Sequence, residues 1–277
     1  MLRKILVPTD FSEHAEYALK VAAQLANRYD AEIFLLHMLE LPLQLIDPSR
    51  GGGGGNLPES LFFMKLAHQQ FEEVMAKPYL EGLTVHETVE FHEAFEGIMD
   101  IAEDKGCDLI VMGSHGTSGM KEMFIGSNTE KVVRNSHIPV LVIKKEHEDF
   151  HPKEFVFATD FTEKMKKPFM NAARFAEKLG TRIHLVYVNT ASKFKTSMYL
   201  EELMDDFTKN LDIRDFTLNV HNDVTIERGI MNFAKMKNAD IIGIATHGRK
   251  GLSHLLNGSV SEDLANHADR PVLTFKI

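Results

Sequence analysis

The sequence is poor in the features that mark secreted, disulfide-bonded or membrane-spanning proteins. Its single cysteine, Cys107, excludes an intramolecular disulfide framework and suits a reducing compartment. The longest apolar candidate for a membrane helix, residues 33–46, is interrupted by His37, Glu40 and Pro42. The N-terminus enters a strand-like run almost at once, so we expect no signal peptide. These absences predict a cytoplasmic protein without a membrane partner.

Positive charge is also scarce, above all in the first half of the chain. The net charge is −9; residues 1–149 carry 13 Lys and Arg against 24 Asp and Glu, and residues 150–277 carry 18 against 16. Polyanions bind to clustered positive charge, so the acidic first half argues against nucleic acid as the main partner. The asymmetry is either solvated surface or a source of attraction between opposite halves or subunits.

Three familiar functional motifs are absent or misplaced. Nothing reads G-x4-G-K-S/T, and no G-x-G-x-x-G occurs, so we expect neither a Walker loop nor a dinucleotide cofactor. Residues 147–151 have the letters of the zinc motif H-E-x-x-H, which needs a helix to place both histidines on one face. This stretch instead precedes Pro152, between the two halves of the chain. We interpret it as a linker and assign no metal site.

What the chain does contain is an internal repeat. Residues 5–14 (ILVPTDFSEH) match residues 155–164 (FVFATDFTEK), and residues 97–119 align without a gap with residues 229–251. Each half also ends in a short apolar run led by proline, at Pro139 and Pro271. Three blocks in the same order identify a duplication.

The duplication predicts two domains, at residues 1–146 and 152–277. The first half is longer in the middle, where the extra length includes Pro42 to Pro58 and the run Gly51–Gly55. A segment of this composition is flexible and cannot pack a core, so we expect either a surface loop there or an engineered replacement of one.

Each half alternates strand-like and helix-like patterns. Residues 12–28 carry an apolar helical face, with Ser12 as the N-cap, and a second apolar stripe runs from Met64 to Met75. Short, continuously apolar runs are typical of strands covered on both faces, and alternating βα units imply a parallel, doubly wound sheet with ligands at the carboxyl ends of its strands. The strands predicted in the first half are 5–7, 33–36, 85–91, 109–112 and 140–143.

The loop after the fourth strand has the composition of an anion site. Gly113 and Gly116 are followed, after nine residues, by Gly126 and Ser127. Glycines allow backbone N–H groups to approach an anion, although glycines at such turns can also be purely structural. The helix expected to open at Ser127 adds unpaired N–H groups and a positive dipole end. The loop therefore predicts a phosphate-binding site.

The spacing Gly-x2-Gly-x9-Gly-Ser, between an apolar strand and a helix, resembles the ATP-binding motif of the universal stress protein family. The opening Ile5-Leu-Val-Pro-Thr-Asp10 also resembles that family's first strand, whose acidic residue reaches the nucleoside. Both halves share the resemblance, so the chain resembles a tandem universal stress protein. This implies two Rossmann-like (adenine nucleotide alpha hydrolase-like) α/β domains. Each would have a five-stranded parallel sheet of order 3-2-1-4-5 flanked by helices, with the last strand often pairing domains.

The resemblance implies adenine and ribose near the first two strands and phosphates over the glycine loop. Asp10 would accept a hydrogen bond from the ribose or adenine, and Met38 would offer its backbone to adenine. The alternatives are a helix cap for Asp10 and an ordinary core or rim position for Met38. The expected nucleotide-binding residues of the first half are Pro8, Thr9, Asp10, Met38, Met112, Gly113, His115, Gly116, Gly126, Ser127 and Asn128.

The second half departs from the motif at its first glycine, which is Ala245. Alanine is tolerated where the backbone needs neither a positive φ nor very close approach of a ligand. Arg249 and Lys250 follow the next glycine, where they would either reach phosphates or face solvent. The expected nucleotide-binding residues of the second half are Ala158, Thr159, Asp160, Val188, Ala245, Gly248, Gly258, Ser259 and Val260.

The resemblance implies a stress-response or signalling protein that binds ATP, with or without Mg²⁺. No catalytic carboxylate, lysine or Mg²⁺ ligand pair is evident at the loop, so we expect ATP to bias conformation or partner binding rather than to be turned over rapidly. A slow ATPase and a nucleotide-free interaction module remain alternatives. We also expect a homodimer through exposed strand edges or helices. His115 and His247 are interpreted as positional, and Cys107, which aligns with Ala239, as a small buried apolar residue.

Overall fold

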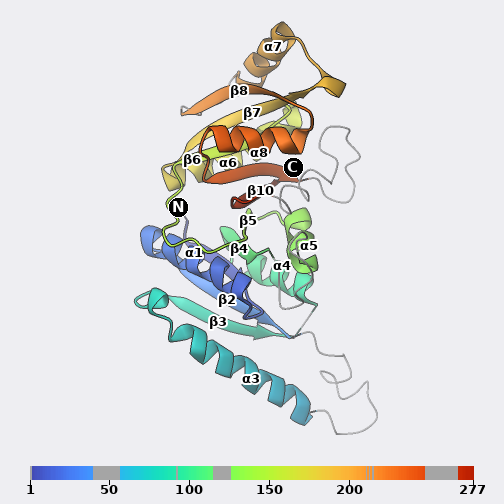
Figure 1. The fold of residues 1–277 in the computed structure, drawn as a ribbon. Helices are drawn as coiled ribbons and strands as arrows, with labels where there is room; N and C mark the ends of the chain where they lie inside the picture. The colour runs from blue at the N-terminus through green and yellow to red at the C-terminus, as the bar shows by residue number, and fades with distance from the viewer. Residues whose placement is uncertain are drawn as a thin grey trace, which may run out of the picture. The chain divides into compact units, whose positions relative to one another are not determined.

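A computed structural model of the chain (Figure 1) describes residues 2–39, 57–91, 93–114, 126–209, 211, 213, 215–246 and 268–277. The chain divides into two compact units. The first comprises the described parts of 1–120, 126–132 and 143–150, and the second comprises those of 133–142 and 151–277. Within the described part of the chain, no helix is long and apolar enough to cross a membrane.

The first unit is built on a parallel sheet of order β3-β2-β1-β4. Ile5, Leu6 and Val7 are fully buried in β1, as expected for a strand covered on both faces. The predicted N-cap is confirmed, because the Ser12 hydroxyl accepts the N–H of Ala15 at 3.3 Å. The elements of the first repeat are β1 (Lys4–Pro8), α1 (Glu13–Tyr29), β2 (Glu32–Met38), α3 (Leu57–Met75), η1 (Pro78–Leu80), β3 (Val85–Glu90), α4 (Ala94–Asp104), β4 (Leu109–Gly113), α5 (Ser127–Asn135) and β5 (Val140–Ile143).

The second unit repeats the pattern in the order β8-β7-β6-β9-β10, all parallel, which is the predicted 3-2-1-4-5. Residues 133–142 belong to this unit, so the last strand of the first repeat, β5, pairs antiparallel with β10, with Leu141 opposite Leu273. The elements of the second repeat are β6 (Glu154–Ala158), η2 (Glu163–Met165), α6 (Lys166–Leu179), β7 (Arg182–Thr190), η3 (Ala191–Lys193), α7 (Ser197–Thr208), β8 (Phe216–Asp223), α8 (Ile226–Met236), β9 (Ile241–Thr246) and β10 (Val272–Lys276).

The duplication extends to individual hydrogen bonds. In the first repeat the Asp108 carboxylate, just before β4, accepts the N–H groups of Arg3 and Lys4 at 2.8 and 3.1 Å. In the second repeat Asp240, just before β9, accepts the N–H groups of residues 153 and 154 at 2.7 and 3.0 Å. Each carboxylate thereby ties the start of the fourth strand to the start of the first strand of its repeat.

Two connecting segments bear on the sequence expectations. Helix α3 begins at Leu57, so Pro58 lies in a first helical turn rather than in the expected loop; proline is tolerated there because the first-turn N–H groups have no helical partner. Residues 40–56, with Gly51–Gly55, lie outside the described residues.

Residues 147–151 are not helical, which confirms the linker interpretation. The linker is held to α1 by Gln24, which donates to the His147 carbonyl at 2.8 Å. Among the described residues, no group of three or more His, Cys, Asp or Glu is arranged to hold a metal.

Candidate functional site

The turn that follows the first strand is built in the same way in both repeats. The N–H of Thr9 donates to the carbonyl of Leu36 on β2 at 2.8 Å, and the N–H of Thr159 donates to Val186 on β7 at 3.0 Å. Each threonine hydroxyl then accepts the N–H of the phenylalanine two residues later at 3.0 Å. The Thr-Asp pair is therefore held at the carboxyl edge of the sheet, beside the end of the second strand.

Asp10 and Asp160 stabilise this turn through one carboxylate oxygen. Asp10 Oδ1 accepts the N–H of Ser12 at 3.1 Å, and Asp160 Oδ1 accepts both the N–H and the hydroxyl of Thr162 at 3.0 and 2.7 Å. These are Asx-type turns. Because Ser12 is the residue that caps α1, Asp10 is not its N-cap, and the helix-cap alternative does not hold for that residue.

The residue after each aspartate has a left-handed backbone. Phe11 has φ 61° and Phe161 has φ 57°, a region that bulky residues rarely adopt. The rings are held by aromatic packing: Phe11 lies 5.2 Å from Phe71, and Phe161 lies 5.2 Å from Phe207. Backbone strain maintained by packing on both sides of a duplication indicates a turn whose shape is needed, which is typical of binding sites.

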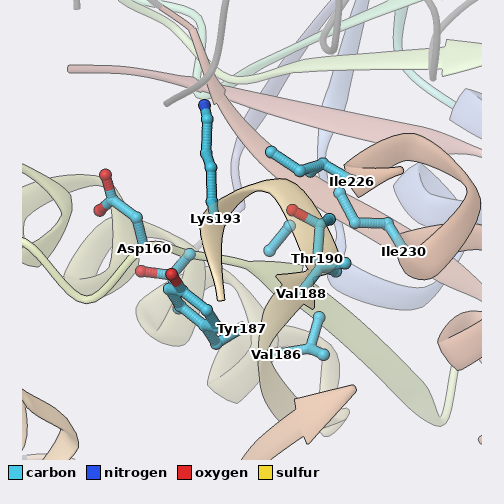
Figure 2. A pocket seen from close by; sticks show the side chains of 10 residues that line it. Asp160, Val186, Tyr187, Val188, Thr190, Lys193, Ile226 and Ile230 are labelled. Carbon is cyan, nitrogen blue, oxygen red and sulfur yellow. The ribbon is translucent and has the colours of Figure 1, made fainter. Parts of the chain in front are cut away.

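In the second repeat the turn lines a pocket, shown in Figure 2. Four residues expected from the sequence, Ala158, Thr159, Asp160 and Val188, lie on its wall. Two isoleucines of α8 line the opposite side, and Asp160 and Tyr187 lie together across from them (Figure 2). The residues that sequence reasoning missed are Val186, Tyr187, Thr190, Lys193, Ile226 and Ile230.

The polar groups of this pocket include one cation and one neutral hydroxyl. Lys193 stands on the η3 turn, which Asn189 holds by accepting the N–H of Lys195 at 2.9 Å and donating to its carbonyl at 3.2 Å. Burial raises the pKa of the Tyr187 phenol, and the charge of Asp160 raises it further, so the hydroxyl stays neutral. The only sequence signal for Tyr187 was its alignment with His37, whose Nδ1 lies 2.8 Å from the Thr9 carbonyl.

The pocket is chemically suited to a nucleoside but narrow. Apolar walls suit a base, Asp160 suits hydroxyl donors, and Lys193 suits an anion. The volume is about 30 Å³, whereas ligand pockets usually measure several hundred Å³. Helix α8 packs closely here, since a Cβ on Gly229 would lie 2.4 Å from Val188. The pocket is therefore tightly bounded on the side of Val188.

Gly113, at the end of β4, is required for a reason that the sequence analysis did not identify. A Cβ there would lie 2.6 Å from the carbonyl oxygen of His14 and 3.0 Å from the N of Ala15, in the first turn of α1. The glycine is thus explained by helix packing. In the second repeat the corresponding turn is the 3-10 turn η2, α6 begins only at Lys166, and Ala245 is accommodated in the buried end of β9.

The two described ends of the glycine loop are joined in the first unit. Helix α5 opens at Ser127, as predicted, and the N–H of Gly126 donates to the Ser114 carbonyl at 2.7 Å. The buried Thr129 hydroxyl donates to the Gly113 carbonyl at 2.9 Å. Ser127 is exposed in the first turn of α5. Of the other expected residues, Pro8 and Met112 are buried, Met38 and Asn128 are half-buried, and His115, Gly116, Gly248, Gly258, Ser259 and Val260 lie outside the described residues.

Comparison with known proteins gives a consistent result. The model of the universal stress protein family matches twice, at residues 1–144 and 152–276. Universal stress protein MJ0577 of Methanocaldococcus jannaschii is 37% identical over 158 residues, which cover 53% of this chain and 98% of that protein. Universal stress protein Slr1230 of Synechocystis is 26% identical over 99% of this chain and 100% of its own length.

The fold agrees with that of a solved structure that covers the whole chain. A universal stress protein from Archaeoglobus fulgidus superimposes with a TM-score of 0.74 and 20% identity, covering 100% of this chain and 99% of that one. Another universal stress protein, solved in complex with cAMP, matches 45% of this chain and 97% of its own at 18% identity and a TM-score of 0.35. With its two matched regions, this chain belongs to the universal stress protein family.

Proposed function

We propose that this chain is a cytoplasmic stress-response or signalling protein that binds an adenine nucleotide, ATP with or without Mg²⁺, at the carboxyl edge of each repeat. The observation that supports this most is the pocket lined by Ala158, Thr159, Asp160 and Val188, four residues expected from the sequence. The same Thr-Asp turn beside the second strand occurs in the first repeat.

In this proposal different residues bind the ribose, the base and the phosphates of the nucleotide. Asp10 and Asp160 accept hydrogen bonds from ribose hydroxyls, and Met38 and Val188 flank the base. The first turn of α5, with Gly126, Ser127 and Asn128, donates N–H and hydroxyl groups to phosphate oxygens in the first repeat. In the second repeat the ammonium group of Lys193 supplies positive charge.

We propose that the first repeat binds more tightly. Its site does not depend on the narrow pocket of about 30 Å³ between Val188 and Ile226. Opening that pocket costs free energy, because apolar side chains must leave well-packed positions. The second repeat therefore binds only at higher nucleotide concentration.

The nucleotide serves as a ligand that biases conformation or partner binding. At the described ends of the glycine loop, the side chains are those of Ser114, Ser127, Asn128 and Thr129. Hydroxyl and amide groups donate well to phosphate but are weak bases, so they favour binding over rapid hydrolysis. We also propose that the protein acts as a homodimer.

Isothermal titration calorimetry with ATP tests the proposal. Asp10→Asn keeps an oxygen for the turn but removes the charge, and should weaken the tight site at least tenfold. Asp160→Asn should affect only the weak site. Glu13→Gln, an exposed carboxylate three residues after Asp10, is the matched control and should leave binding unchanged. A wild-type protein that gives no signal with ATP, ADP, AMP or cAMP would overturn the proposal.

A further inference from the structure

A second pocket of the second unit lies at the opposite edge of its sheet from the Thr-Asp turn. It is formed by α6, the turn that leads into β7 and the residues just before β8. Because β6, β7 and β8 are parallel, the residues before them share the amino edge of the sheet, whereas Asp160 follows β6 at the carboxyl edge. The volume is about 760 Å³, within the range of small-molecule sites. This is called the amino-edge pocket.

Helix α6, which forms one wall of this pocket, has a direct counterpart in α1. Both helices end at a residue with a left-handed backbone, Asp30 with φ 54° and Gly180 with φ 66°. These two residues are 150 positions apart in the chain, the same interval that separates the threonines of the two Thr-Asp turns. Met170, which lines the pocket, therefore corresponds to Lys20.

In the first repeat an aromatic ring lies over this position of the helix. The turn η1 packs on α1, where Lys20 Nζ lies 5.8 Å from the centroid of the Tyr79 ring. The next residue, Leu80, is buried. The first repeat thus fills with its own chain the space beside α1 that corresponds to the amino-edge pocket.

The second repeat has no aromatic residue in the matching connection. Between α3 and β3 the first repeat has nine residues, 76–84, which include η1, whereas between α7 and β8 the second repeat has seven, 209–215. These seven residues read Lys-Asn-Leu-Asp-Ile-Arg-Asp. The amino-edge pocket is therefore space that a tyrosine side chain occupies in the other repeat.

The apolar walls of the pocket suit an aromatic ring. Apolar side chains line it from α6, from β7 and from the residues before β8: Met170, Ala173, Ala176, Ile183 and Ile213. A methionine sulfur makes favourable contacts with the edge of an aromatic ring. Met170 can therefore hold a ring where Lys20 holds that of Tyr79.

The charged residues that line the pocket are Arg174 and Glu177 of α6, and Asp215 before β8. All three are exposed and so accessible to a ligand. The planar guanidinium of arginine binds a carboxylate through two parallel hydrogen bonds, and the two carboxylates suit an ammonium group. A phosphate would meet both carboxylates, so these charges disfavour a nucleotide here.

We propose that the amino-edge pocket binds a free aromatic amino acid. Its ring lies against Met170, in the space that Tyr79 fills in the first repeat. Its carboxylate binds Arg174, and its ammonium group binds Glu177 and Asp215. The pocket lies at the other edge of the sheet from the nucleotide site, so the two proposals stand or fall separately.

A titration of the ¹⁵N-labelled full chain with L-phenylalanine, L-tyrosine and L-tryptophan, followed by NMR, tests the proposal. The amide signals of Ala173 and Ala176 should shift, and the shifts give the dissociation constant. Arg174→Met should weaken binding about tenfold, because a hydrogen-bonded charge pair is lost. Lys235→Met, at an exposed cation on α8, is the matched control and should leave binding unchanged.

A ligand without a carboxylate isolates the role of Arg174. Phenethylamine should bind the wild type about tenfold more weakly than L-phenylalanine, for the same reason. Arg174→Met should not weaken phenethylamine further, whereas Glu177→Gln should weaken both ligands. An Arg174→Met variant that loses both ligands equally would show that the guanidinium does not bind the carboxylate.

Three other outcomes would overturn the proposal. If none of the three amino acids shifts these signals at its solubility limit, the pocket is not such a site. Shifts confined to the residues around Asp160 would place the ligand at the carboxyl edge instead. If N-acetylphenylalaninamide, which carries neither charge, binds as tightly as L-phenylalanine, then the pocket binds an aromatic side chain of a peptide rather than a free amino acid.

Discussion

Phe11 and Phe161 share a left-handed backbone conformation, with φ of 61° and 57°, at the same position of the two repeats. Neither is glycine or asparagine, the residues that adopt this region most easily. In each case the ring reaches the helix after the second strand, at Phe71 or Phe207. The turn that holds Asp10 or Asp160 is thus coupled through one aromatic ring to the packing of its repeat.

This strain predicts an unusual order of stability for substitutions at Phe161. The residue is buried, so Phe161→Ala and Phe161→Gly both lose the ring, at a cost of about 3–5 kcal/mol. Glycine adopts the left-handed conformation freely, whereas alanine does not, so the glycine variant should be the more stable by about 1 kcal/mol. Urea unfolding compares the two. Equal stability, or a more stable alanine variant, would show that the turn relaxes.

The packing of α1 on β4 predicts an asymmetry between the repeats. In Gly113→Ala the new methyl would lie 2.6 Å from the His14 carbonyl oxygen, a backbone atom that cannot rotate away. We expect a loss of about 1–3 kcal/mol, as for overpacked cores. The reciprocal Ala245→Gly removes a methyl that the second repeat accommodates and should cost at most about 1 kcal/mol. Unfolding of both variants in urea measures this; comparable losses would contradict the explanation.

Asp108 and Asp240 should contribute similarly to the two repeats. Each carboxylate accepts two N–H groups at the start of the first strand of its repeat. Hydrogen bonds to a charged acceptor stabilise by about 1.5–3 kcal/mol when buried and by less near solvent, so each Asp→Ala variant should lose about 1–3 kcal/mol. Asp104→Ala, at the exposed end of α4, is the control and should be nearly neutral. A loss in one repeat only would refute the equivalence.

Cys107 predicts a dependence of stability on alkaline pH. Burial raises the pKa of its thiol to about 11, whereas a thiol in an unfolded chain has a pKa of about 8.5. Between these values the unfolded chain releases a proton that the folded chain keeps, so the free energy of unfolding falls as pH rises.

Cys107→Ala removes this contribution and should fold, since Ala239 occupies the equivalent position. The N–H of Cys107 donates to Ala102 at 2.9 Å, and that of Ala239 to Ala234 at 2.8 Å. Relative to the wild type, the variant should gain stability from about pH 8.5 to about pH 11. Urea unfolding across this range measures the difference; parallel curves would mean that the thiol is not buried.

The fold could be predicted from the sequence because its signals are local and occur twice. Short apolar runs marked the strands, and the hydroxyl before an acidic residue marked the cap at Ser12. The alignment of Cys107 with Ala239 predicted a buried position in each repeat, and both are buried. Local periodicity and a duplication are enough to determine the order of elements.

The remainder depends on contacts between distant segments. The sequence predicts Gly113 to be a phosphate-loop glycine. The structure shows instead that a Cβ at this position would clash with the carbonyl of His14, a residue far away in the sequence. Lys193 and Ile230 line the pocket because η3 and α8 meet at the carboxyl edge of the sheet. The spacing of residues in the sequence does not predict that these two elements meet. The left-handed backbone at Phe11 contradicts its local preference and is retained through tertiary packing.

The central claim is that the chain binds adenine nucleotides, and the most direct test is to count them. The protein is purified without added nucleotide and denatured, and the released ligand is identified and quantified by chromatography. The account predicts an adenine nucleotide approaching one per chain, greatly reduced in Asp10→Asn and unchanged in Glu13→Gln. A wild-type protein that releases no nucleotide, and that also gives no calorimetric signal with ATP, would contradict the account and favour a nucleotide-free interaction module on the same fold.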